Sequence, residues 1–422
     1  MTGPAAGHPL LAGDQRPLQG LRVIELSSFV ATPLGGMTLA QLGADVIRID
    51  PPHGAADRQR WPVTEDGQSL YWAGLNKGKR SVVIDSRTAQ GAELVAQLIS
   101  APGDGAGIVL TNISGRAAPS YDELVRRRPD LVHVHLTGHH DGRTAVDYTV
   151  NASSGFALVT GPEQHAEPVN HVLPAWDVAC GLYLAVAILG AERARRLTGR
   201  PQRVQLALHD VALATADNLG FLAEAQVNRV RRPKVGNNVY GTYGRAFPTG
   251  DERHVMVVAL TRRHWADLVA MTGTQAPVEA VERALAADFS QESERYRHRE
   301  VLGALLAPWF AARGTAEIEE ALAGTSLLWS RFRSFLEVVD DGDLAGNPIV
   351  GAVEQPGIGR YLATGSPLRF ADQDLPAAPA PALGADTEDV LTELLGLGQQ
   401  DLLRLHRDGV LNTPQAQRLT VS

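Results

Sequence analysis

Short apolar segments alternate with segments of helical periodicity in the first third of this 422-residue chain, and this alternation constrains the fold most. The short runs rich in Val, Ile and Leu are residues 21–26, 44–50, 80–85, 106–110 and 131–136. The helical patterns lie between them, for example residues 31–43, with Pro33 near the start and Gly43 at the end. Strands that alternate with helices predict an α/β fold with a parallel, doubly wound sheet.

Changes of composition divide the chain into three parts. Residues 1–229 carry the alternating pattern and predict a large domain. Residues 230–330 are rich in Gly, Asn and Tyr at first and helical afterwards, which predicts a smaller α+β domain. Residues 331–422 pass through a Pro- and Ala-rich linker to a last helix, and we expect this part to return to the large domain.

Charge and cysteine content exclude several classes of protein. The net charge of −8, without a run of like charges, argues against binding to nucleic acid. The single cysteine, Cys180, excludes a disulfide framework within the chain and fits a reducing cytoplasm. The N-terminal residues do not follow a signal-peptide pattern, and the most apolar stretch, residues 178–191, is too short to span a bilayer. We therefore expect a cytoplasmic protein that binds neither nucleic acid nor membrane.

One acidic residue, Asp177, interrupts the otherwise almost wholly apolar residues 170–189. An ionised carboxylate in apolar surroundings is unfavourable unless it is paired or hydrogen-bonded. A helix N-cap or a satisfied buried polar group would account for Asp177, and so would a nucleophile or general base with a shifted pKa. The stretch alone leaves both interpretations open.

Two further segments have a structural and a functional interpretation. The stretch LNKGKRS, residues 75–81, is either a solvated basic loop or a loop that binds phosphate. The stretch NNVYGTYGRAF, residues 237–247, is either a flexible connector or a mobile loop that closes over a substrate.

Other motifs indicate little chemistry. The segments between strand and helix contain neither a G-x-G-x-x-G motif nor a P-loop, which argues against a standard NAD or ATP site. His133, His135, His139 and His140 lack a convincing carboxylate or cysteine partner for a metal, so we expect no metal site. Cys180 has no evident base beside it and is typical of a small buried hydrophobe.

Several stretches, in the same order, resemble the class III CoA-transferases. They are LQGLRVIELSSFVATPLGGMTLAQLGADVIRIDPP, LNKGKRSVVID, LPAWDVACGLYLAVAILGAERARRLTGRPQRVQLALHD, GSPLRF and LGADTEDVL. The resemblance implies a CoA-dependent enzyme of two-domain subunits, which interlock as a homodimer, with acyl-CoA as the substrate and no cofactor beyond the CoA that it carries. It also places Asp177 at the position of the family's nucleophile, where the carboxylate forms an anhydride and then an aspartyl-CoA thioester.

The resemblance also suggests residues for CoA and for the substrate. A CoA contact at Lys79 is implied, and with it a binding surface formed by Lys77, Arg80, Asn112, Arg48, Ser28, Phe29 and Val30. A second basic position of the family reads Ser120 here, so Arg48, Arg60 or Arg116 would take its place. Tyr240, Gly241, Tyr243, Gly244 and Arg245 would form the substrate loop.

Departures from the family pattern reduce the number of activities that we expect for this chain. Ser28, Phe29 and Val30 replace the His-Val-Gln run of formyl-CoA transferases, which disfavours oxalate and formate. The catalytic His of the racemases reads Val146, and a further racemase acid reads Thr261, so one of the two bases is missing. VDYTVN and VNHVLPAWD are most similar to members that move CoA between the C1 and C4 carboxyls of one mesaconate. The alternatives are an intermolecular transferase for another dicarboxylic acid, a racemase, and a non-catalytic acyl-CoA-binding protein.

Overall fold

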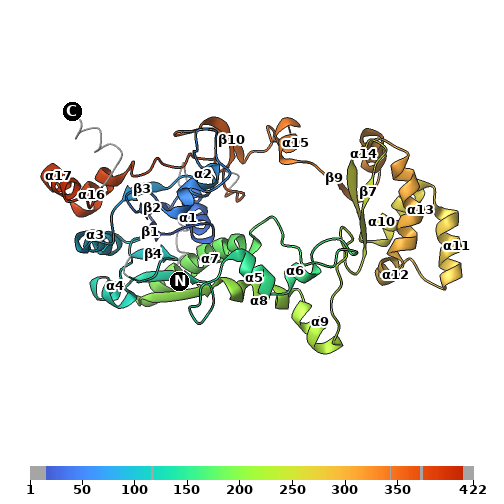
Figure 1. The fold of residues 1–422 in the computed structure, drawn as a ribbon, viewed down its shortest axis with the longest axis horizontal. Coiled ribbons are helices and arrows are strands. Elements are labelled where there is room, and N and C mark those ends of the chain that lie inside the picture. The colour runs from blue at the N-terminus through green and yellow to red at the C-terminus, as the bar shows by residue number, and fades with distance from the viewer. Residues whose placement is uncertain (1–15, 116–117, 343, 371–373, 412–422) are drawn as a thin grey trace, which may run out of the picture. The chain divides into compact units, whose positions relative to one another are not determined.

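The computed structural model describes residues 16–115, 118–342, 344–370 and 374–411, and the chain divides into two compact units (Figure 1). The large unit comprises Met1–Ser154, Val172–Leu222 and Ala345–Ser422. The small unit comprises Gly155–His171 and Ala223–Leu344. The boundaries expected at 229/230 and 330/331 lie instead at 222/223 and 344/345, and residues 155–171 belong to the small unit rather than the large one.

A six-stranded parallel sheet forms the centre of the large unit. Its strands are β1 (Arg22–Leu26), β2 (Asp45–Asp50), β3 (Arg80–Val83), β4 (Ile108–Thr111), β5 (Val132–Thr137) and β6 (Gln202–Ala207). Their order is β3-β2-β1-β4-β5-β6, and every neighbouring pair is parallel. This confirms the α/β fold class and the five strands expected from the apolar runs. The order reverses between β1 and β4, and ligands of doubly wound folds bind at the carboxyl ends of the strands beside such a point.

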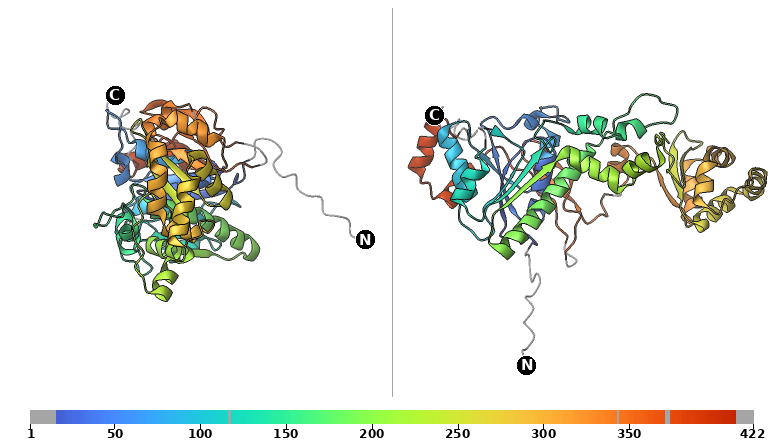
Figure 2. Two further views of the ribbon diagram at one scale, coloured as in Figure 1. Left: turned by 90° about the vertical axis from the view of Figure 1, so that its right-hand side faces the viewer. Right: turned by 90° about the horizontal axis from the view of Figure 1, so that it is seen from below.

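Helices cover both faces of this sheet. The helices are α1 (Ala31–Gln41), α3 (Ala89–Ser100), α4 (Tyr121–Arg127), α7 (Ala175–Thr198), α16 (Thr387–Leu395) and α17 (Gln399–Arg407). Ile24, Ile47 and Val109 join α3, α16 and α17 in one buried apolar cluster. On the other face, α1 packs against α7, and the long helix α7 runs beside β5 and β6, as the right-hand view of Figure 2 shows.

Two glycines let α1 and α7 approach closely. A Cβ atom at Gly181 would lie 2.9 Å from the Ala31 carbonyl oxygen, and one at Gly35 would lie 3.0 Å from the Gly181 carbonyl oxygen. The close approach fixes the position of α7, and therefore of Asp177 in its first turn. With 24 residues, α7 extends beyond the apolar stretch noted in the sequence, and by length and composition alone it could cross a membrane.

The small unit has its own sheet and its own core. Its antiparallel strands are β7 (Tyr243–Pro248), β8 (His254–Ala259) and β9 (Leu328–Arg331), in the order β7-β8-β9. Its helices include α10 (Arg262–Thr272), α11 (Gln275–Leu285), α12 (Glu292–Arg297), α13 (Arg299–Ala311), α14 (Thr315–Ala323) and α15 (Phe335–Asp340). Phe247, Phe310 and Leu306 are fully buried, and the rings of Phe247 and Phe310 stack with centroids 4.2 Å apart.

Shorter elements complete the described chain. They are η1 (Ala56–Gln59), α2 (Leu70–Leu75), α5 (Asp147–Ser153), α6 (Phe156–Val159), α8 (Leu208–Asn218), α9 (Phe221–Asn228), β10 (Val350–Gln355) and β11 (Gly359–Thr364).

Residues after 380 close the edge of the sheet at β3. The backbone N–H of Ser81 donates to the Asp386 carboxylate at 2.8 Å, and that of Val83 donates to the Thr387 hydroxyl at 3.0 Å. These side chains occupy donors that would otherwise be open to another strand.

Candidate active site

Asp177 lies in the first turn of α7 and lines a cavity of about 670 Å³ within the large unit. The other walls come from the β1–α1 loop, the segment after η1, the end of β4 and the start of α5. Among the lining residues are Ser28, Phe29, Val30, Arg60, Tyr71, Asn112, Ser114, Val146 and Asp147. Ser28 and Asn112 follow β1 and β4, so the cavity opens where the order of strands reverses, as the fold predicts.

The electrostatic surroundings of Asp177 raise its pKa to about 7. Burial is the largest cause and the charge of Asp147 adds to it, while Arg60 acts in the opposite direction. A helix dipole favours the ionised form of an acid in the first turn, but burial and a second acid outweigh it here. Within the described residues, its carboxylate has no hydrogen bond or ion pair. A carboxylate of this kind is a better nucleophile than an ordinary solvated one.

Asp147 is a residue of the candidate site that the sequence analysis missed. Its Oδ2 accepts the backbone N–H groups of Trp176 at 2.7 Å and of Asp177 at 3.1 Å, so it caps α7 from a distant segment. Pro174, the N-cap residue, has no capping side chain, and the Asp147 Oδ1 is buried without a partner in the described structure. Only its position directly after Val146, the residue compared with the racemases, could have indicated it.

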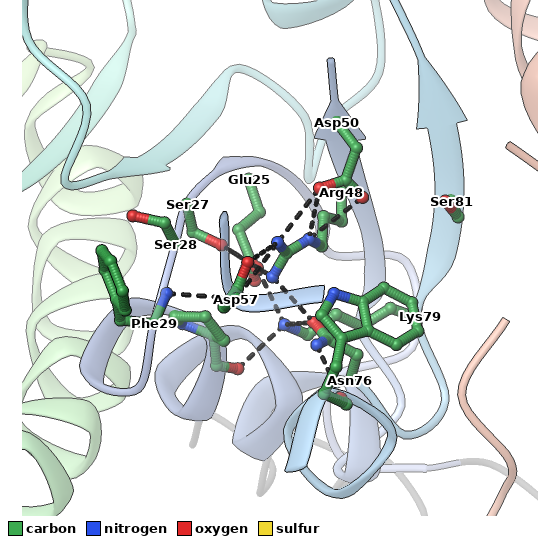
Figure 3. Close-up of polar contacts among 12 residues, drawn as sticks. Glu25, Ser27, Ser28, Phe29, Arg48, Asp50, Asp57, Asn76, Lys79 and Ser81 are labelled. Carbon is green, nitrogen blue, oxygen red and sulfur yellow. Dashed lines mark hydrogen bonds and ion pairs between the residues drawn. The ribbon is translucent and has the colours of Figure 1, made fainter. Parts of the chain in front are cut away.

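The β1–α1 loop is held in place on two sides. The Asn112 side chain donates to the Ser28 carbonyl at 3.0 Å and accepts the Ser28 N–H at 3.1 Å. Phe29 adopts a left-handed backbone with φ +66°, and its N–H donates to the Asp57 carboxylate at 3.1 Å (Figure 3). Left-handed backbone is unfavourable for a phenylalanine, so Asp57 stabilises a conformation that the loop would not adopt by itself.

Asp57 belongs to a buried network of charged residues (Figure 3). The Arg48 guanidinium is paired with Asp50 at 3.0 Å and with Asp57 at 3.3 Å. The Lys79 ammonium donates to the Glu25 carboxylate and to the side-chain amide oxygen of Asn76, each at 2.8 Å. All these side chains are almost inaccessible to solvent, and burial lowers the pKa of Lys79 to about 8 against the opposing charge of Glu25.

The prediction that basic side chains of residues 75–81 contact CoA phosphates does not agree with the positions of these side chains. Lys79 and Arg48 are enclosed in the buried network, and the Lys77 ammonium donates to the Thr364 carbonyl at 2.8 Å. Arg80 begins β3 and pairs with Asp45 and Glu393, so it lies at the amino edge of the sheet rather than the ligand edge.

Two other positions were considered for CoA binding, Ser120 and Arg116. The Ser120 hydroxyl accepts the Glu123 N–H and caps α4. Arg116 lies outside the described residues.

The suggested substrate loop belongs to the small unit, whereas Asp177 belongs to the large one. The prediction of a loop is wrong for Tyr243, Gly244 and Arg245, which form strand β7 and pair with β8. Tyr243 is buried because the strand packs its side chain against the ring of Trp265. Tyr240 and Gly241 lie in the turn before β7, and closure over the substrate stays a prediction.

The remaining candidates have structural positions. Among the described residues no group of three His, Cys, Asp or Glu side chains could hold a metal ion. Burial lowers the pKa of His133 to about 4, and the ring of His139 packs on that of His209. Burial, followed by the charge of Asp177, raises the pKa of the Cys180 thiol, which argues against a thiolate nucleophile.

An unpaired carboxylate in the first turn of a helix, in a cavity at the reversal point of a doubly wound sheet, has the position that a nucleophile for acyl transfer requires. The chain belongs to CoA-transferase family III, which it matches over residues 18–387.

Relatives support this assignment over nearly the whole chain. A 2-methylfumaryl-CoA isomerase of Chloroflexus aurantiacus is 50% identical over 94% of this chain and 98% of its own. A succinyl-CoA:mesaconate CoA-transferase of Haloarcula hispanica is 26% identical over 89% of this chain and 96% of its own. The crystal structure of a CaiB/BaiF family protein from Brucella suis has the same fold, with a TM-score of 0.75 over 90% of this chain, 100% coverage of its own and 24% identity.

Proposed function

We propose that this enzyme moves CoA between the two carboxyl groups of one mesaconate, converting 2-methylfumaryl-CoA into 3-methylfumaryl-CoA. The observation that carries the proposal is the Asp177 carboxylate, unpaired in its cavity, in a chain 50% identical to a 2-methylfumaryl-CoA isomerase. It acts as a class III CoA-transferase whose donor and acceptor are parts of the same molecule.

The reaction proceeds through covalent steps at Asp177. The carboxylate attacks the thioester carbonyl, a mixed anhydride forms and CoA thiolate leaves. The thiolate then attacks the aspartyl carbonyl of the anhydride, which gives an aspartyl-CoA thioester and free mesaconate. The other carboxylate of mesaconate attacks this thioester, and the same two steps in reverse release Asp177 and the isomeric product.

The first turn of α7 holds Asp177 in position for these steps. The helix dipole contributes a positive potential there, and the charge of Asp147 opposes it. The Asp147 carboxylate occupies the N–H groups of Trp176 and Asp177 and so fixes the first turn. The cavity must exclude water, because the anhydride and the thioester would otherwise hydrolyse.

A second hollow of about 500 Å³ offers room for the remainder of CoA. It lies at the carboxyl ends of β1, β2 and β4, is lined by Pro51, His53 and Ile113 among others, and shares Ser28 with the Asp177 cavity. We propose that the nucleotide portion of CoA lies here, with Ser28, Phe29, Val30 and Asn112 between nucleotide and thioester.

Isotopic labelling tests the proposal. Unlabelled 2-methylfumaryl-CoA is supplied with an excess of labelled free mesaconate, and the product is analysed by mass. Intramolecular transfer gives 3-methylfumaryl-CoA with almost no label, since the bound mesaconate reacts again before it leaves. Heavy labelling, or efficient transfer to succinate, would instead identify an intermolecular transferase.

A racemase is disfavoured by the structure of the cavity. Val146, at the position of the racemase histidine, is an exposed apolar residue at the start of α5. Thr261 caps α10 in the small unit through its hydroxyl. Neither residue can abstract a proton next to a thioester.

The setting proposed for the enzyme follows the sequence analysis. We propose a cytoplasmic homodimer that needs no cofactor other than the CoA of its substrate. The net charge of −8 supports the absence of nucleic acid as a partner, and the packing of α7 against α1, β5 and β6 supports its place in a folded core rather than in a membrane.

A further inference from the structure

Arg60 shares the cavity of Asp177 and its backbone is fixed there. Its carbonyl oxygen accepts the Ser69 hydroxyl at 2.6 Å, and its N–H donates to the Asp57 carbonyl at 3.1 Å. The charges of Arg60 and Asp177 interact, because the guanidinium opposes the rise in the pKa of that carboxyl. The two side chains therefore act on the same volume of the cavity.

Two aromatic rings orient the guanidinium of Arg60. Its Cζ lies 5.6 Å from the ring centroid of Phe29 and 5.2 Å from that of Tyr71. Cation–π contacts use the face of a guanidinium and leave the N–H groups along its edge free to donate. The backbone of Phe29 is itself held in place, because Asp57 accepts its N–H and is paired with Arg48.

Arg60 differs in its partners from the other cation of the cavity wall. Arg143 is paired with Asp141 at 2.7 Å. Within the described residues, Arg60 forms no ion pair with any carboxylate at bonding distance. Arg60 is thus an oriented cation near Asp177 that has no anionic partner among the described residues. Such a cation can bind a free carboxylate of the substrate.

We infer that Arg60 binds the free carboxylate of the substrate, and that it selects monothioesters of dicarboxylic acids. This inference rests on the proposed function and names the residue that recognises the second carboxyl group. In the starting thioester Arg60 binds the carboxylate that carries no CoA. Once CoA is on Asp177, mesaconate has two carboxylates, and Arg60 retains the molecule by the newly released one while the other reacts. No bond to Arg60 forms or breaks.

A pair of substrates separates this role from a general effect on the cavity. Tiglyl-CoA has a methyl group in place of the free carboxylate of 2-methylfumaryl-CoA and otherwise the same acyl skeleton. Its reaction stops at the aspartyl-CoA thioester with release of tiglate, which a single-turnover experiment measures. Arg60→Gln should lower kcat/KM for 2-methylfumaryl-CoA about 100-fold, equivalent to about 2.7 kcal/mol. It should leave tiglate release within about threefold of the wild-type value, since tiglyl-CoA cannot bind the lost charge.

Two more variants complete the experiment. Arg60→Lys keeps the charge without the planar fork and should lose less than Arg60→Gln. Arg58→Gln is the matched control, because Arg58 is two residues away and lies over the ring of Trp72, at 5.0 Å, outside the Asp177 cavity. It should change kcat/KM less than about threefold. Arg60→Gln should also admit more labelled free mesaconate into the product, because retention is lost.

Equal losses on both acyl-CoAs, or equal losses in Arg58→Gln, would overturn the inference. So would an unchanged kcat/KM for 2-methylfumaryl-CoA in Arg60→Gln. The proposed function fails separately, if the wild-type enzyme does not isomerise 2-methylfumaryl-CoA. In that case the comparison is repeated with succinyl-CoA and butyryl-CoA, which differ in the same carboxylate.

Discussion

Two groups of carboxylates lie near the β1–α1 loop of the large unit, and their surroundings differ in kind. Glu25, Asp50 and Asp57 are buried together with Arg48 and Lys79, so that each acid has a cation at bonding distance (Figure 3). Asp177 and Asp147 are near each other without a bonded cation in the described structure, and the pKa of Asp177 is raised to about 7.

The difference shows how one fold keeps the paired carboxylates that support its structure apart from the carboxylate that is proposed to react. In the network, the cations compensate buried acids and fix the loop through the bond between Asp57 and Phe29. In the cavity, no cation among the described residues bonds the Asp177 carboxylate. The lack of a bonded cation raises the reactivity of this carboxylate and destabilises the folded protein. Substitutions in the first group should therefore affect stability, and those in the second should affect activity.

The largest expected effect is the loss of activity in Asp177→Asn. An amide cannot form the anhydride, so we expect kcat to fall by about 10⁴-fold or more while CoA affinity changes little. Steady-state kinetics and calorimetric titration with CoA measure the two quantities. Substantial activity in this variant, or hydroxylamine trapping at another residue, would contradict the mechanism.

Lys79→Met tests the network. The substitution removes the ammonium that bonds Glu25 at 2.8 Å and leaves only the Arg48 guanidinium, at 3.8 Å. Removing one partner of a buried ion pair costs about 3 to 5 kcal/mol of the free energy of unfolding. Lys77→Met is the matched control, because Lys77 bonds only a backbone carbonyl among the described residues and should cost about 1 kcal/mol. Urea unfolding compares them. Equal losses of unfolding free energy in the two variants would show that the ion pair between Lys79 and Glu25 adds no stability beyond that of an ordinary hydrogen bond.

Asp177→Asn should also stabilise the protein, in a pH-dependent way. The pKa of Asp177 is higher in the folded protein than its ordinary 3.8, so ionisation lowers folding stability as the pH rises from about 4 to 7. The gain of the variant should be small at pH 4 and reach at most about 4 kcal/mol at pH 8. Unfolding at several pH values measures it, and a gain independent of pH would contradict the assignment of the pKa.

Asp147→Asn should have the smallest effect. The amide oxygen can still accept the N–H groups of Trp176 and Asp177, so the cap is weakened by about 1 kcal/mol. The lost negative charge should lower the pKa of Asp177 and move the acid limb of the kcat/KM profile to lower pH by roughly one unit. An unchanged profile would mean that burial alone raises the pKa of Asp177.

The fold was largely predictable because it depends on patterns that are local in the sequence. The strands at 21–26, 44–50 and 80–85 follow from apolar runs, and one acid in an apolar stretch marks Asp177 as a candidate. These signals need no knowledge of which distant residues meet. The strand order likewise agrees with the doubly wound fold that alternation predicts.

The partners of charged side chains were not predictable in this way. Lys79 and Arg48 look like surface cations in the sequence, yet strands β1 and β2 place Glu25, Asp50 and Asp57 around them. Asp147 is thirty positions from Asp177, and only the folded chain brings its carboxylate to the end of α7. Arg60 was considered for phosphate, but the rings that orient it come from separate segments.

The closure of β3 by Asp386 and Thr387 has a consequence for the order in which the chain can fold during synthesis. The small unit includes the continuous stretch Ala223–Leu344 and is fully translated before these two residues exist. The central sheet, although its strands are made early, keeps an open edge at Ser81 and Val83 until then. The nascent chain thus has an incomplete sheet through most of translation. The side chains that prevent the β3 edge from pairing with other chains are added only near the end.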